Sequence, residues 1–195
     1  MSSDHTDARI SRQVRRLETL LEDRGLVAGA ALDETLDAFL SGASPANGAR
    51  IVAKAWTDPA YRQRLVEDGT AAVAELGYSA GGVQPQRLRV VENTAHEHHV
   101  VVCTLCSCYP VRLLGPSPSW YKSEAYRSRV VREPRAVLAE FGLDLPEDTA
   151  ITVWDSSSET RYMVLPRRPE RTEELTEDEL AALVSRNALI GTAAI

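Results

Sequence analysis

The 195-residue chain has no apolar run long enough to cross a membrane and no excess of basic residues. A transmembrane helix needs about 20 consecutive apolar residues, so the sequence predicts no membrane span. With 28 acidic residues against 22 basic ones, the formal net charge of −6 argues against a nucleic-acid-binding surface. The sequence also shows no secretory signal, internal repeat or low-complexity segment. We therefore expect a soluble, cytoplasmic protein, and its 44% apolar composition is enough for a sizeable core.

Cysteine is also scarce, and all three cysteines lie within six positions, Cys103-Thr104-Leu105-Cys106-Ser107-Cys108. This clustering excludes disulfides between distant parts of the chain, and one local disulfide would leave a thiol over. Because a tight turn makes the three sulfurs converge, we interpret the cluster as a metal site. A closed zinc site takes four side-chain ligands, usually in two distant pairs. The fourth would be His98 or His99, and only one of them could reach, because adjacent strand residues point to opposite faces.

Cys106 and Cys108 enclose two peptide nitrogens, those of Ser107 and Cys108. If both amides deprotonate, two nitrogens and two sulfurs form a planar set, with the Cys103 thiolate on the axis and one position open for substrate or water. A peptide nitrogen gives up its proton only to a strongly Lewis-acidic ion, so this donor set favours low-spin trivalent cobalt or iron over zinc. The predicted metal ligands are therefore Cys103, Cys106, Ser107 and Cys108.

These six residues resemble the metal-binding motif of the α subunit of nitrile hydratases, and Thr104 resembles the cobalt-type form. The similarity extends through most of the chain and includes the segments Ala55–Pro59, Asp68–Thr70, Val91–Thr94, Tyr126–Arg135, Trp154–Glu159 and Val164–Pro166. The resemblance implies a subunit that adds water to a nitrile to give an amide at a non-corrin Co(III) centre, with Fe(III) as the alternative. It also implies that Cys106 is oxidised to a sulfinate and Cys108 to a sulfenate, while Cys103 remains a thiolate.

The resemblance further implies which residues and partners take part in the reaction. The candidate catalytic residues are Cys108, whose sulfenate is a candidate nucleophile or base, Ser107 in the ligand loop, and Gln84, which lies where the family often has a glutamine beside the site. A surface role fits Gln84 equally well. The expected partners are a β-type subunit in a heterotetramer, a cobalt-delivering activator protein and a small-molecule nitrile. Local cations that could touch the oxidised sulfurs, unless they form a solvated or interface face, are Arg127, Arg129, Arg132 and Arg135.

One departure from the family pattern lies close to the loop. Val111 and Arg112 stand where most relatives have tryptophan and proline, which favours a bulkier substrate such as the cyano-substituted nucleoside toyocamycin. Two other functions remain open. The chain could be the metal-bearing subunit of a thiocyanate hydrolase, which shares the loop, or a non-catalytic metal carrier or redox sensor built on three thiols.

Hydrophobic spacing divides the chain into a helical first part and a mixed second part. Apolar residues at helical spacing predict helices before Gly25 and over 32–40, 47–55, 57–69, 70–76, 123–131, 134–141 and 176–186. β-Branched content predicts strands at 87–92, 99–102, 151–154 and 160–165. We expect an α+β protein with a partner-embracing helical arm at 1–56 and a catalytic metal-binding domain at 57–195. For that domain the resemblance implies a layered α-β-β-α arrangement that carries a metal-binding claw loop.

Overall fold

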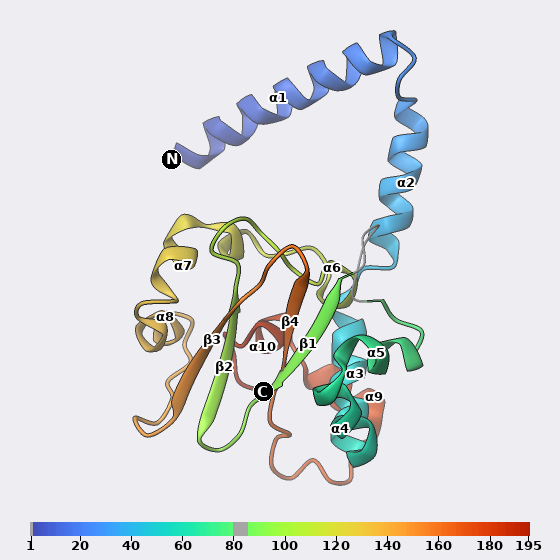
Figure 1. Ribbon diagram of the computed structural model, residues 1–195. Coiled ribbons are helices and arrows are strands. Elements are labelled where there is room, and N and C mark those ends of the chain that lie inside the picture. The colour runs from blue at the N-terminus through green and yellow to red at the C-terminus, as the bar shows by residue number, and fades with distance from the viewer. Residues whose placement is uncertain (1, 80–85) are drawn as a thin grey trace. The chain divides into compact units, whose positions relative to one another are not determined.

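The computed structural model describes residues 2–79 and 86–195, in two compact units that divide between Gly42 and Ala43 (Figure 1). The first unit consists of α1 (Ser2–Asp23) and α2 (Gly29–Ser41). Gly25, with φ of 65°, ends the first helix as predicted, because the left-handed backbone there suits a residue without a Cβ. No helix in the described ranges combines the length and the apolarity that a bilayer span requires.

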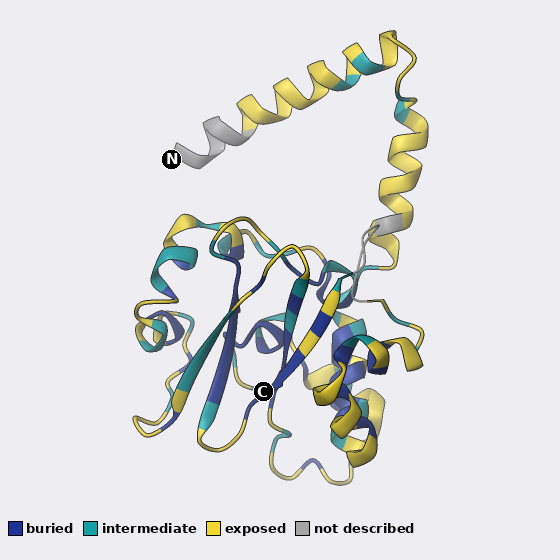
Figure 2. Ribbon diagram, viewed as in Figure 1, coloured by how far each residue is buried: buried dark blue, intermediate teal, exposed yellow. Residues whose placement is uncertain are grey.

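Most of the large apolar side chains described in this first unit are exposed (Figure 2). They recur three or four residues apart in each helix, so each helix carries an apolar stripe on one side. The exposed members are Ile10, Val14, Leu17, Leu20, Leu32, Leu36 and Leu40. Among the residues of this unit whose burial is described, none is buried against these stripes.

The second unit begins with three helices, α3 (Pro45–Thr57), α4 (Pro59–Glu67) and α5 (Gly69–Glu75). Asp58 caps α4 by accepting a hydrogen bond from the backbone N–H of Tyr61, and Pro59 occupies the first turn, as the sequence predicts. Six residues of α3 are buried. The helix therefore belongs to the second compact unit, which begins at Ala43, and the predicted division into an arm at 1–56 and a catalytic domain at 57–195 stays a prediction.

Four strands form two parallel pairs. Strand β1 (Arg87–Glu92) pairs with β4 (Thr160–Leu165), and β2 (Glu97–Val102) pairs with β3 (Ala150–Asp155). Strands β3 and β4 follow each other closely in the sequence but belong to different pairs. Side chains join the two pairs, since the rings of Trp154 and Tyr162 stack with centroids 5.1 Å apart.

Helices cover the outer sides of the two strand pairs (Figure 1). Helix α8 (Pro134–Glu140) contacts β3, and the preceding α7 (Glu124–Arg129) contacts α8. Helices α4 and α5 contact β1. The short α6 (Val111–Leu114) packs on α3, and a 3-10 turn, η1 (Ser119–Lys122), leads into α7. The predicted α+β class with a helical first part is confirmed, and the order of layers is helix, strand pair, strand pair, helix.

The C-terminal segment closes the second unit. Helix α9 (Glu177–Leu183) opens with the predicted capping box of Thr176 and Glu179 and packs on α3. The sequence predicts one helix through residue 186, but Val184 is extended and Ser185 caps a separate helix, α10 (Arg186–Ile190). Helix α10 contacts both β2 and β4.

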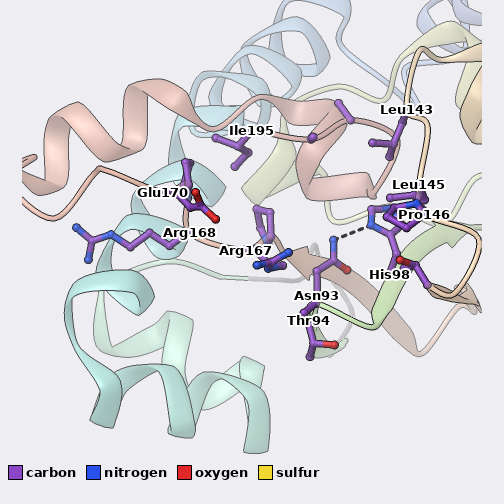
Figure 3. Close-up of a pocket in the computed structure, with 16 residues that line it drawn as sticks. Asn93, Thr94, His98, Leu143, Leu145, Pro146, Arg167, Arg168, Glu170 and Ile195 are labelled. Carbon is purple, nitrogen blue, oxygen red and sulfur yellow. Dashed lines mark hydrogen bonds between the residues drawn. The ribbon is translucent and has the colours of Figure 1, made fainter.

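A buried histidine ties β2 to this C-terminal segment (Figure 3). The Oδ1 atom of Asn93 accepts the backbone N–H of His99 at 2.8 Å, which turns Asn93 Nδ2 toward His98 Nδ1 at 3.1 Å. The other ring nitrogen of His98, Nε2, then donates to the carbonyl of Gly191 at 2.8 Å. Burial lowers the pKa of His98. Both the hydrogen bonds and the burial therefore favour the neutral ring with its proton on Nε2.

We predict that this network makes the fold less stable in mild acid. As pH falls below about 6.5, the unfolded chain protonates His98 while the folded chain does not, so stability present above this value is lost as pH falls. The loss is at most about 1.4 kcal/mol per pH unit for one proton. Urea unfolding between pH 5 and 8 measures the slope. His98→Gln should reduce it and the exposed His96→Gln should not, whereas an equal slope in wild type and His98→Gln would contradict the assignment.

Candidate metal centre

The cysteine loop starts where a fully buried strand ends. Val100, Val101 and Val102 are all buried, and their β-branched side chains fill both faces of β2. The hydroxyl of Tyr126 donates to the carbonyl of Val101 at 2.7 Å, and the N–H of Ser156 donates to the carbonyl of Val102 at 2.7 Å. The loop is thus attached to a strand end whose last peptides are fixed.

The loop brings the three sulfurs together. Cys103 Sγ lies 3.4 Å from Cys106 Sγ, which lies 3.1 Å from Cys108 Sγ, and the three atoms fit within 4.8 Å of one another. Cys103 is buried, Cys108 is half-buried and Cys106 is exposed. Neither His98 nor His99 joins the cluster among the residues that the structure describes. The convergence expected of Cys103, Cys106 and Cys108 is present, and their binding of a metal stays a prediction.

The thiols of Cys106 and Cys108 differ in acidity. Hydrogen bonds from the Cys108 and Cys103 thiols, assisted by the backbone N–H groups of Ser107 and Cys108, lower the pKa of Cys106 to about 7. Burial raises the pKa of Cys108, and the nearby Arg161 guanidinium opposes that rise. Cys106 therefore ionises more readily than Cys108. The peptide nitrogens of Ser107 and Cys108, which are the predicted nitrogen ligands, face the same sulfur.

Side chains from three other segments hold the loop from outside. Asp155, the last residue of β3, accepts the Thr104 backbone N–H at 2.9 Å and the Thr104 hydroxyl at 2.5 Å. The buried Tyr121 donates its hydroxyl to the carbonyl of Cys108 at 3.0 Å. Arg127 donates from Nη1 to the carbonyls of Cys106 at 3.2 Å and Thr104 at 3.5 Å. Asp155 and Tyr121 were not among the predicted site residues. The parallel register that sets Val102 opposite Asp155 is what brings Asp155 to the loop.

The four candidate arginines in and after α7 make different contacts. Only Arg127 among the four candidates makes a hydrogen bond to the loop within the described residues. Arg129 pairs with Glu133 and Glu140, and the remaining two, Arg132 and Arg135, bond to carbonyls of Ser128 and of Leu145, Pro146 and Thr149. Gln84, the remaining predicted site residue, lies outside the described residues.

A separate cavity of about 290 Å³ lies around His98 (Figure 3). His98 precedes Cys103 by five residues of extended chain, so the cavity is about 16 Å from the sulfurs. Arg167, Arg168 and the C-terminal Ile195 also line it. Both ring nitrogens of His98 are already in hydrogen bonds. We therefore place the chemistry at the sulfur cluster, where the thiols with shifted pKa values lie.

Comparison with known proteins decides the family. The family model described as "Nitrile hydratase, alpha chain" matches residues 8–193. The chain belongs to this family. It is therefore an enzyme subunit of the hydro-lyase class, and the family predicted from the cysteine motif is confirmed.

Three similar proteins show the range of the family. The α subunit of the high-molecular-weight cobalt-containing nitrile hydratase of Rhodococcus rhodochrous is 51% identical over 180 residues, which is 92% of this chain and 88% of the relative. A double mutant of the Fe-type nitrile hydratase from Comamonas testosteroni Ni1 has a TM-score of 0.88 at 44% identity, covering 96% of this chain and 90% of that one. The γ subunit of thiocyanate hydrolase from Thiobacillus thioparus is 50% identical over 158 residues, 76% of this chain and 65% of the relative.

We predict that Tyr121→Phe lowers the free energy of unfolding of the metal-free chain by about 1–3 kcal/mol, because it leaves the Cys108 carbonyl without its partner. The control is Tyr162→Phe, since the Tyr162 hydroxyl makes no hydrogen bond within the described part of the chain. Urea unfolding with an unchanged m-value measures both variants. If the two variants lost equal stability, the Tyr121 hydroxyl would not be what holds the loop.

Proposed function

We propose that the chain is the metal-bearing α subunit of a cobalt-type nitrile hydratase, which adds water to a nitrile to give the amide. In this proposal Cys103, Cys106 and Cys108 bind the ion through sulfur, and Ser107 and Cys108 bind it through their peptide nitrogens. The observation that carries the proposal is the loop itself, in which the three sulfurs lie within 4.8 Å of one another and the Cys106 N–H donates to Cys103 Sγ at 3.3 Å. The donor set fits a trivalent ion, because thiolates with strongly donating nitrogens suit cobalt or iron better than zinc.

Two features favour cobalt over iron. Thr104 has the residue type of the cobalt form, and both of its polar hydrogens go to Asp155. The cobalt-containing relative from Pseudonocardia thermophila is 48% identical over 191 residues, 97% of this chain and 93% of the relative. Low-spin Co(III) is therefore the proposed metal, with Fe(III) as the alternative.

The environments of the three sulfurs support the proposed oxidation pattern. Thiolate character and exposure govern how readily a cysteine oxidises. Cys106 is exposed and has a lowered pKa, which supports its conversion to a sulfinate. Cys103 is only 1% exposed, which supports its remaining a thiolate. The proposed sulfenate, Cys108, has a cation nearby, since Arg161 acts on it electrostatically.

The residues of the chain then have separate roles in the reaction. When bound, the ion supplies Lewis acidity at its open position. The sulfenate oxygen of Cys108 is the proposed nucleophile or base, and the Arg161 guanidinium, 8% exposed, stabilises negative charge on it. The Nε–H of Arg161 is buried without a partner in the described residues, so this donor is available for an oxygen on sulfur. Gln84 is kept as a catalytic candidate because of its position in the family pattern.

Exposed apolar residues support a partner subunit. Leu105 projects from the loop beside the sulfurs and is 89% exposed, so a partner that covers the loop would also cover this side chain. The stripes of α1 and α2 are exposed in the same way. We propose that a β-type subunit is embraced by the helical arm, covers the loop and supplies further cations to the oxidised sulfurs. A heterotetramer, a cobalt-delivering activator protein and a cytoplasmic location also stay predictions.

The second candidate function is hydration of thiocyanate. It is favoured by the similarity to the thiocyanate hydrolase γ subunit, which is 50% identical over 158 residues. The reaction acts on the same carbon–nitrogen triple bond, so the loop suits both substrates. Amide production from nitriles without thiocyanate turnover would select the first function. Membership of an enzyme family disfavours the metal carrier or redox sensor that three thiols alone would allow.

The substrate proposal depends on Val111. This residue begins α6, three residues after Cys108, and it is only half-buried. Its neighbour Arg112 is tied through its carbonyl to Asn47 at 2.8 Å, which fixes the backbone at this point. A valine in place of a tryptophan has a much smaller side chain and leaves more space beside the cysteine loop. We propose that the space beside the cysteine loop accepts a bulky heteroaromatic nitrile of the toyocamycin kind.

The first test is the composition of the complex purified with its β-type partner. We predict one cobalt per chain and an added mass of about three oxygens on the loop, two on Cys106 and one on Cys108. Cys103→Ser, Cys106→Ser and Cys108→Ser should each abolish cobalt loading and activity, because each removes a soft ligand. The control Ser107→Ala should keep its cobalt, since the proposed ligand is the backbone nitrogen. Zinc at full occupancy on unmodified thiols would refute the proposal.

The second test is Val111→Trp. We predict that kcat/KM falls for a bulky cyano-heterocycle and rises for a small aliphatic nitrile, a difference worth about 1–3 kcal/mol in transition-state binding. Val131→Trp is the control, because Val131 is an exposed valine on the turn after α7. If Val111→Trp changed both substrates by the same factor, Val111 would not line the pocket.

A further inference from the structure

Arg127 holds the carbonyl side of the cysteine loop. Its Nη1 atom donates to the carbonyl of Cys106 at 3.2 Å and, more weakly, to that of Thr104 at 3.5 Å. Residues 103–108 make no backbone–backbone hydrogen bond to any described residue. The shape of the loop therefore depends on side chains that reach it from elsewhere, and Arg127 is the one that holds the peptide between Cys106 and Ser107.

The helix that carries Arg127 is held firmly in place by the neighbouring residue, Tyr126. Arg127 follows Tyr126, which is 5% exposed and bonds through its hydroxyl to the carbonyl of Val101 at 2.7 Å. The Tyr126 ring also packs against Trp120 and Phe141, with centroids 4.9 Å and 6.1 Å away. Helix α7 is thereby fixed to the strand from which the loop starts. The hydrogen bond from Arg127 therefore joins α7 to the cysteine loop, and the distance between α7 and the end of β2 is already fixed.

Because the peptide group is planar, the contact between Arg127 and the Cys106 carbonyl also sets the direction of the Ser107 N–H. In a trans peptide the C=O and N–H groups of one unit point in opposite directions, and the described residues contain no cis peptide. Holding the Cys106 carbonyl toward Arg127 therefore turns the Ser107 N–H away from Arg127. The Ser107 nitrogen therefore lies on the other side of this peptide, within the loop that brings the three sulfurs within 4.8 Å of one another.

We propose that Arg127 is a positioning residue of the metal loop, which sets the Cys106–Ser107 peptide so that the Ser107 nitrogen faces the three sulfurs as a ligand. This inference rests on the proposed function, because it assigns Arg127 through the metal ligand Ser107. An arginine suits the task because one end of its planar fork meets two carbonyls. Its Nε–H is buried without a partner in the described chain, so the contact is made by the Nη1 end alone.

The test compares Arg127→Gln and Arg127→Lys with the control Arg132→Gln. Arg132 lies on the turn after α7 and bonds only to the carbonyl of Ser128 within the described residues, so this control removes the same charge without touching the loop. Hydrogen exchange of the amides of residues 104–108 is measured in the metal-free full chain. Cobalt uptake and the visible sulfur-to-cobalt charge-transfer bands are measured in the complex with the β-type subunit, and thermal unfolding checks the fold of each variant.

We expect loop amides to exchange about tenfold faster in Arg127→Gln, at an unchanged unfolding temperature. The cobalt concentration for half-loading should rise about 10–100-fold, as when partners of metal ligands are lost, and the charge-transfer bands should shift. Arg127→Lys should restore part of each effect, and Arg132→Gln should match wild type.

If Arg127→Gln fails to fold, the exchange, cobalt loading and spectrum of Arg127→Lys test the inference in its place. Wild-type exchange, loading and spectrum in both variants would overturn the inference. A wild-type complex that takes up no cobalt would instead overturn the proposed function. Amide exchange in the metal-free chain would still show whether Arg127 orders the loop.

Discussion

The parallel pairing of β2 with β3 is the constraint on which the metal loop depends. The pairing sets Val102 opposite Asp155, so the carboxylate at the end of β3 meets Thr104 at the start of the loop. Buried valines on β2 fix the level at which the loop begins. Because β2 and β3 run in the same direction, both end on the side of the molecule where the cysteines lie. A change that shifted this register by one residue would separate Asp155 from the loop and turn every β3 side chain to the other face.

The remaining supports are attached to the same strand pair. Tyr126 fastens α7 to the carbonyl of Val101, and the next residue, Arg127, bonds to the loop. Arg161 follows soon after Asp155, at the start of β4, and comes close enough to Cys108 to oppose the rise in its pKa. The loop thus has carbonyls held from outside and N–H groups that face sulfur on the inside. This arrangement is what a site needs if peptide nitrogens and thiolates are to bind one ion together.

The candidate site was more predictable than its supports because its predicted ligands are local in sequence. The six-residue motif carries all three thiols, and the strands at 87–92 and 160–165 have the bounds that their β-branched content predicts. The contacts that hold the loop join residues far apart, with Thr104 to Asp155 and Arg127 to Cys106 separated by 51 and 21 positions. These contacts form only when the helices and strands pack together, so the sequence pattern does not indicate them. In the same way, burial of α3 against the second unit, which sets the boundary at Gly42, comes from tertiary contacts that spacing alone does not give.

The central claim is that peptide nitrogens and cysteine sulfurs of one loop bind a trivalent cobalt ion. Cobalt K-edge X-ray absorption of the loaded complex tests it directly. We predict an edge energy typical of Co(III), with a shell of about three sulfurs and a shorter shell of about two nitrogens in addition to the ligand at the open position. A shell of sulfur alone, or a divalent ion with only water and thiolate ligands, would contradict the account.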